Sequence, residues 1–159
     1  MTASDIKGGL SIRCSYGNAR VRDVDGRLGV TASSTTVQAE SIRGPVDVET
    51  TYGSVDLNGI TGAITVVNQS GSVTVRGLSG AALGAEHRVQ TSYADIDFTW
   101  PAAQSVSFSL ESTYGRVESR IPGTLRESGS RKILEGSQGG SKARVTLVSQ
   151  SGSVLLRSE

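Results

Sequence analysis

The chain has 159 residues, a formal net charge of +1 and a pI of about 7.9, so its charge does not favour nucleic acid or an acidic membrane as partner. Aromatic residues make up only 4% and glycine contributes 20 residues, as is typical of an all-β chain with many tight corners. The length predicts a single domain, residues 1–159, that buries its own core. Cys14 is the only cysteine, which excludes an internal disulfide and a cysteine metal cluster.

Residues 6–80 form a regular repeat with a period of 18 residues. Within each unit apolar residues alternate with polar ones, as in Val55-Asp56-Leu57, which predicts short strands with one buried face. Recurrence at a short fixed period predicts stacked units that contact only their neighbours. An aliphatic residue lies two positions before each recurring glycine. These glycines are Gly8, Gly26, Gly44, Gly62 and Gly80.

The fold predicted from this repeat is a right-handed, single-stranded parallel β-helix, or solenoid, with 18-residue coils. A left-handed hexapeptide helix would need an aliphatic residue at every sixth position. Asn18, Thr36 and Ser54 interrupt that series. A right-handed coil also agrees with the strong preference of parallel crossover connections for that hand.

Residues 81–157 are predicted to form irregular coils of the same kind. The corner motif Thr51–Val55 returns at Thr91–Ile96 and at Thr113–Val117. The terminal stretch Val145–Val154 closely repeats Ile64–Val73. We therefore expect the coil to resume after each interruption and to end in a closing strand.

Three interruptions are predicted within this second part. Residues 81–88 form a short insertion, which places the only histidine, His87, on the surface. Residues 100–103 (Trp-Pro-Ala-Ala) form a turn before a strand at Val106–Leu110. Residues 121–142 form a hairpin-like excursion, with a strand at residues 132–134 and a mobile Gly-rich loop at 136–141.

Residues for catalysis or cofactor binding are sparse in the sequence. Acid–base catalysis on a β-helix would need carboxylates gathered on one outer face, and in the 18-residue frame no outward ladder stacks two acids. Asp95 and Asp97 come closest, and we interpret them as a solvated strand face. A single histidine does not favour a zinc site. No phosphate-binding loop or serine nucleophile elbow is present, so neither cofactor nor metal is expected, and Cys14 is expected to be half-buried and unreactive.

Four tyrosines are the candidate ligand or partner surface: Tyr16, Tyr52, Tyr93 and Tyr114. Tyr16 and Tyr52 lie two coils apart, with serines in the intervening slots. One interpretation is that each ring covers the small residue of the next coil. The sharper hypothesis is an aromatic strip that stacks on sugar rings or on a partner protein.

The first and last coils of a solenoid leave unpaired backbone groups unless the ends are capped. Only residues 1–5 precede the first in-phase residue, Ile6. We therefore expect one open end that pairs with another copy or with an upstream segment of a longer exported or anchored protein. The sequence itself contains no signal peptide and no apolar run long enough for a transmembrane helix.

Four features of the sequence carry a resemblance to a known family. They are the serial Ser/Thr-Tyr/Ser-Gly-x-Val corners, residues 119–122, residues 136–140 and the final Ser149–Val154. Over residues 6–157 the chain resembles a bacterial adhesin-type family of unknown function, itself similar to the toast-rack domains of envelope-stress proteins. Serines or arginine at positions 54, 72, 116 and 153 replace the acids or asparagines common there. The resemblance implies a right-handed β-helix-like domain in the periplasm or on the cell surface.

The function expected from these observations is a non-enzymatic extracytoplasmic structural or adhesion-type binding module. Its partner would be a glycan or an envelope protein. One alternative is a sensor or output domain in cell-envelope stress signalling. A second, less favoured alternative is a polysaccharide-active enzyme, which the missing carboxylate cluster argues against. Nucleic-acid binding and direct membrane insertion of this segment are not expected.

Overall fold

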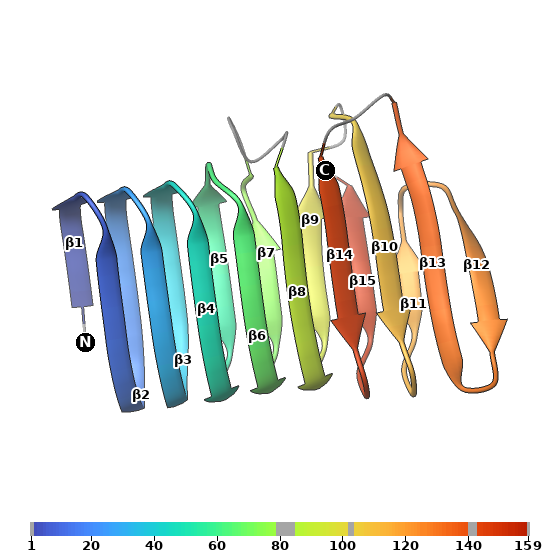
Figure 1. The fold of residues 1–159 in the computed structure, drawn as a ribbon, viewed down its shortest axis with the longest axis horizontal. Coiled ribbons are helices and arrows are strands. Elements are labelled where there is room, and N and C mark those ends of the chain that lie inside the picture. Colours follow the sequence, from blue (N-terminus) through green and yellow to red (C-terminus); the bar gives the residue numbers. More distant parts are fainter. Residues whose placement is uncertain (1, 79–84, 102–103, 140–142, 159) are drawn as a thin grey trace.

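The computed structural model describes residues 2–78, 85–101, 104–139 and 143–158, and these contain strands and no helix. The prediction of an all-β chain is confirmed. The strands lie side by side in two facing layers, and we call this two-layered stack the rack (Figure 1). They are β1 (Thr2–Lys7), β2 (Leu10–Asp25), β3 (Leu28–Arg43), β4 (Val46–Tyr52), β5 (Val55–Ile60), β6 (Ile64–Ser70), β7 (Val73–Arg76), β8 (Glu86–Tyr93), β9 (Ile96–Trp100), β10 (Val106–Ser112), β11 (Val117–Ser119), β12 (Gly123–Ser128), β13 (Arg131–Gln138), β14 (Arg144–Ser149) and β15 (Val154–Ser158).

The first half of the molecule pairs strands in parallel with residues 18 apart in register. Leu28 of β3 lies beside Val46 of β4, which lies beside Ile64 of β6. All three side chains are fully buried, and each contributes about 1.5–3 kcal/mol by leaving water. The alternation of apolar and polar residues thus becomes a set of apolar ladders between the two layers.

The second half keeps the ladders but changes the order of the chain. β14, near the end of the sequence, lies between β8 and β10, because Leu147 pairs with Val89 on one side and with Leu110 on the other. β15 lies likewise between β9 and β11. The coils resume after the interruptions, but they do not stack in the order in which they occur in the chain, which the repeat did not predict. The last coil in sequence is an inner coil in space (Figure 1).

A hairpin closes the far end of one layer, as predicted for residues 121–142. β13 pairs antiparallel with β10 on one side and with β12 on the other, and β12 is exposed along its length. The predicted loop at 136–141 is partly wrong, because Gly136 lies within β13 opposite Phe108. A side chain at Gly136 would meet the Phe108 ring, so the glycine admits close strand packing. Residues 140 and 141 lie outside the described residues.

His87 is in the core, which corrects the prediction of a surface histidine. It occupies the ladder position between Ile64 and Val145 and is fully buried. Its Nδ1 accepts a hydrogen bond from the Ile64 backbone N–H at 3.2 Å, and its ring lies 5.9 Å from the rings of both Phe98 and Trp100. The pairing offset rises to 23 at this point, so the 18-residue frame could not place the residue.

The opposite end of the stack has a free edge. β1 pairs with the second half of β2, from Arg20 to Asp25. Within the described residues the first half of β2, Leu10–Tyr16, pairs only with β3. The residues before Gly8 therefore form an edge strand, and beside it runs an uncovered strand segment.

Candidate functional site

The four candidate tyrosines share one corner of the rack. Strand pairing places Tyr16 beside Ser34, Ser34 beside Tyr52, Tyr52 beside Ser70, and Ser70 beside Tyr93. This corner is the lower edge in Figure 1, where β4, β6 and β8 end. The first three tyrosines thus alternate with serines, one residue per strand.

The alternation continues through the region where the chain order changes. Ser151 N donates to Ser92 O at 2.8 Å, and Tyr114 N donates to Gln150 O at 2.9 Å. Ser151 therefore follows Tyr93 in space, and Tyr114 follows Ser151. Adjacent strands are about 4.8 Å apart, so successive tyrosines are separated by about 9.6 Å along the rack.

We call this row the tyrosine edge. Its tyrosines are 84%, 56%, 60% and 70% exposed in chain order. Rings that served mainly to cover a neighbouring serine would be largely buried. Most of their apolar surface instead faces solvent, which favours the interpretation of a strip open to a ligand. The members of the edge are Tyr16, Ser34, Tyr52, Ser70, Tyr93, Ser151 and Tyr114.

Stacked glycines fix the backbone immediately after the tyrosine edge. Gly53 and Gly71 have φ of 141° and 132°, values that other residues rarely adopt. A Cβ at Gly71 would overlap the Gly53 carbonyl, and one at Gly53 would overlap the Thr35 carbonyl. In the second half Gly115 lies against the Gly152 carbonyl in the same way. Close approach of successive corners therefore requires glycine at positions 53, 71 and 115.

A buried polar ladder supports the same corner from inside. Asn68 Nδ2 donates to the carbonyls of Gly53 (3.1 Å) and Gly71 (2.6 Å). Ser112 Oγ donates to Gly152 O at 2.8 Å. These side chains satisfy carbonyls that the tight turn points inward. The ladder consists of Cys14, Ala32, Thr50, Asn68, Thr91, Ser149 and Ser112.

The 18-residue period places the first four members of this ladder at equivalent positions but does not indicate their role. The signal was a polar residue in the inward phase of the alternation, two positions before each corner residue. Thr91 and Ser149 repeat the pattern, and both donate to the Ala94 carbonyl. Cys14 is half-buried as expected, and its Sγ lies 3.5 Å from Thr35 Oγ1. The ladder thus supplies hydrogen bonds to the carbonyls of several corners that carry the tyrosine edge.

The corners that carry the tyrosine edge are almost free of charge. Among their residues only Asp95 and Arg116 are charged; the others are Ser, Thr, Tyr, Gly, Ala, Asn and Gln. Asp95 Oδ1 is engaged, since it accepts a hydrogen bond from Ser153 N at 2.7 Å. The surface therefore combines neutral hydroxyl and amide groups with aromatic rings. The corners are residues 15–18, 33–36, 51–54, 69–72, 92–95, 113–116 and 150–153.

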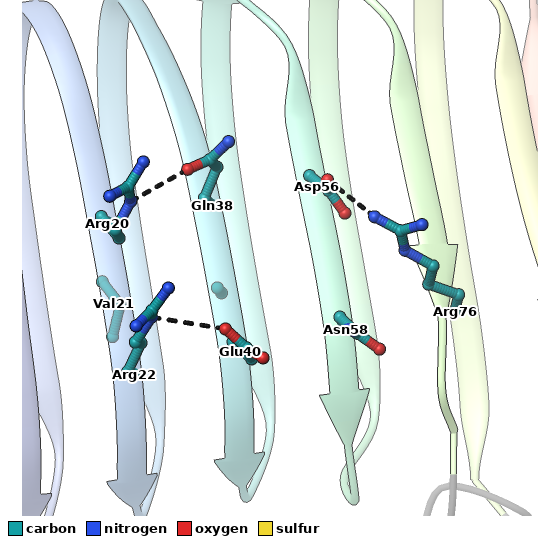
Figure 2. Close-up of a pocket in the computed structure, with 9 residues that line it drawn as sticks. Arg20, Val21, Arg22, Gln38, Glu40, Asp56, Asn58 and Arg76 are labelled. Carbon is teal, nitrogen blue, oxygen red and sulfur yellow. Dashed lines mark hydrogen bonds and ion pairs between the residues drawn. The ribbon is translucent and has the colours of Figure 1, made fainter.

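A groove on the second layer gathers charged side chains, but these pair with one another. Arg22 Nε lies 3.3 Å from Glu40 Oε2, and Arg76 Nη2 lies 3.2 Å from Asp56 Oδ2. Figure 2 shows that each arginine reaches across to a neighbouring strand. Such exposed pairs contribute little stability. The groove is lined by Arg20, Val21, Arg22, Gln38, Ala39, Glu40, Asp56, Asn58 and Arg76.

Other acids noted in the sequence are likewise placed on the outside. Asp97 lies 3.1 Å from Arg157, so Asp95 and Asp97 each have a partner. The expectation that no ladder stacks two acids is wrong at one corner, where Asp5 and Asp23 occupy corresponding positions of β1 and β2. Both have a positive φ, 54° and 51°, as asparagine and aspartate tolerate better than most residues.

Neither a metal-ion cluster nor a membrane-spanning helix occurs in the described part of the chain. In residues 2–78, 85–101, 104–139 and 143–158 no group of three or more His, Cys, Asp or Glu side chains is arranged to hold a metal ion. The same residues include no helix with the length and apolarity to cross a bilayer.

Comparison with known proteins gives one match. The sequence model of the family described as Toastrack DUF4097 matches residues 7–157. No curated protein matches the chain. No solved structure matches it either.

Proposed function

Since the chain belongs to the Toastrack DUF4097 family, a family of unknown function, we propose that it is a non-enzymatic binding module that presents the tyrosine edge to a ligand outside the cytoplasm. The observation that carries this proposal is the spatial alternation of exposed tyrosines. It persists from Tyr93 through Ser151 to Tyr114, although these residues come from coils whose order in space differs from their order in sequence.

Hydrogen bonding and close packing of the corners support a binding role. Asn68 and Ser112 donate to the carbonyls of Gly53, Gly71 and Gly152. These contacts restrict the backbone at those corners, so less conformational entropy is lost there when a ligand is bound. Aromatic rings on such a frame supply contact area with few rotatable bonds. The carboxylates in the groove of the second layer are paired with arginines (Glu40 with Arg22, Asp56 with Arg76). Such pairing fits a structural role of this face better than a role in proton transfer.

The fold in this proposal is a right-handed parallel β-helix with 18 residues per coil in its first half. The 18-residue pairing offset of β2 through β7 supports the coil length. The preference of parallel crossovers supports the hand.

Retention on a cell-envelope fraction tests the proposed function for a ligand of any chemistry. Purified protein is mixed with sedimented envelopes of the cells that produce it, and the bound fraction is measured. We expect wild type to be retained and Tyr52→Ala/Tyr93→Ala to bind about tenfold more weakly, since two stacking rings contribute about 1–3 kcal/mol. Arg22→Ala/Glu40→Ala, on the other layer, is the matched control and should bind as wild type.

Two results would contradict the proposed function. One is absence of retention of wild type. The other is equal retention of wild type and the double tyrosine variant, with both proteins folded by circular dichroism.

A further inference from the structure

The spacing and chemistry of the tyrosine edge point to a specific class of ligand. We propose that it binds a neutral, extended β-1,4-linked glycan with a disaccharide repeat, the geometry of cellulose and chitin chains. This inference rests on the proposed function and names the ligand of the same surface.

The interval between tyrosines matches the repeat of such a glycan. Successive tyrosines lie two strands apart, about 9.6 Å, which is close to the length of one disaccharide in an extended β-1,4-linked chain. In such a chain every second sugar presents the same face in the same direction. Four tyrosines in one row would therefore stack on the first, third, fifth and seventh sugars of a single straight strand.

The tyrosine edge runs in one direction along the rack. Each member of the tyrosine edge is joined to the next by strand pairing or by backbone hydrogen bonds, from Tyr16 to Tyr114. The edge follows the long axis of the rack (Figure 1) and extends over about 29 Å, six strand spacings. A curved chain, such as an α-1,4-linked glucan, would leave this row after one or two contacts.

The low charge of the tyrosine edge favours a neutral ligand. The corners around the rings carry serine, threonine, asparagine and glutamine, whose hydroxyl and amide groups exchange hydrogen bonds with sugar hydroxyls. Asp95 and Arg116 are the only charged residues of these corners and have opposite sign. An anionic polysaccharide or a strongly charged peptide would find no complementary field here. A neutral glycan needs none.

The alternation also explains the serines. A ring in every slot would place aromatic groups about 4.8 Å apart, one ring to each sugar and no space between them. Ser34 and Ser70 are half-buried and leave a gap between rings. Into each gap the intervening sugar, turned over relative to its neighbours, projects its substituents.

Isothermal titration with soluble oligosaccharides tests the ligand class. The probes are chitoheptaose, cellohexaose and maltoheptaose, with alginate as the anionic comparison. We expect binding of a β-1,4-linked oligomer at least tenfold tighter than of maltoheptaose or alginate. Absence of binding to both β-1,4-linked oligomers overturns the inference, as does equal affinity for maltoheptaose.

A rearranged variant tests the spacing itself. Tyr52→Ser/Ser70→Tyr keeps the composition and the number of rings but breaks the two-strand interval. We expect it to keep the wild-type unfolding midpoint, because the exchange moves a ring between two neighbouring positions of the same corner, and to lose about tenfold in affinity. Wild-type affinity in this variant overturns the spacing argument.

The two proposals fail in distinguishable ways. If envelope retention requires Tyr52 and Tyr93 while no β-1,4-linked oligomer binds, the ligand class is wrong and the binding role stands. If retention does not depend on the tyrosines, both proposals fall.

Discussion

The two halves of the rack are built from the same ladders by different routes. In residues 6–78 each strand pairs with the strand one period away, at an offset of 18. In residues 85–158 offsets of 23, 37 and 58 occur, because β14 and β15 insert between strands that precede them in the chain. Both halves nevertheless present buried apolar ladders inside and the tyrosine edge outside. Stacking thus depends on which residues of each strand point into the core and which point outward. A regular sequence period is one way to produce that pattern.

Removal of the last coil should affect the two halves most differently. Among the described residues, deletion of 144–159 removes four buried apolar side chains, Val145, Leu147, Val154 and Leu156. These contribute about 6–12 kcal/mol, close to the whole stability of a domain. We expect β8–β11 to lose hydrogen-exchange protection. Deletion of residues 1–8, an edge strand, should leave the remaining protection in place. Unchanged protection of β8–β11 in the first deletion would contradict the inserted arrangement.

The corner glycines should be equally sensitive in both halves. Gly71→Ala and Gly115→Ala each force a Cβ onto a neighbouring carbonyl, and we expect each to lower the free energy of unfolding by about 3 kcal/mol. Gly17→Ala meets no atom within 4 Å but has φ of 111°, so only backbone strain of about 1–2 kcal/mol is expected. Urea unfolding measures all three. A Gly17 variant as damaging as the other two would argue against close stacking.

The core of the second half uses an aromatic cluster where the first uses aliphatic residues. His87→Leu keeps the volume but removes the acceptor for the Ile64 N–H. We expect a loss of about 1–3 kcal/mol for the unsatisfied buried donor, measured by urea unfolding. Arg88→Leu, on the exposed side of the same strand, should change stability by less than about 0.5 kcal/mol. Equal effects of the two substitutions would contradict the buried position of His87.

The buried polar ladder predicts a smaller contrast. Ser112 Oγ donates to Gly152 O, whereas Thr50 Oγ1 is buried and makes no hydrogen bond within the described residues. Ser112→Ala should lower the free energy of unfolding by about 1 kcal/mol, and Thr50→Val should leave it unchanged or slightly higher. Thermal unfolding of both variants checks this. A destabilised Thr50→Val protein would show that its hydroxyl has a partner.

Much of the first half could be predicted from sequence. The glycine period and the alternation around Val55 and Leu57 together give strands, ladders and parallel stacking. The placement of Tyr52 two strands from Tyr16 follows from the same frame. Short local rules suffice there because every strand pairs with the strand one period away.

The second half could be predicted only in part. The pairing offset changes from 18 to 23 before β8, and the prediction that residues 81–88 form an insertion placed His87 on the surface. The alternation His87-x-Val89-x-Thr91 does place His87 on the same, inward-facing side of the strand as Val89 and Thr91. No local sequence feature indicates that β14 lies between β8 and β10. The position of β14 depends on which exposed apolar ladder the last coil covers. The continuation of the tyrosine edge to Tyr114 was hidden for the same reason.

The central claim is that one continuous edge crosses both halves because β14 lies between β8 and β10. Engineered disulfides on outward-facing positions test it directly in a Cys14→Ala background. Arg88 and Thr146 are register partners, and the Arg88→Cys/Thr146→Cys pair should oxidise readily. Arg88→Cys/Ser109→Cys is separated by two strands, about 9.6 Å, beyond disulfide reach, and should remain reduced. A disulfide in the second pair and none in the first would place β10 beside β8 and break the alternation of the tyrosine edge.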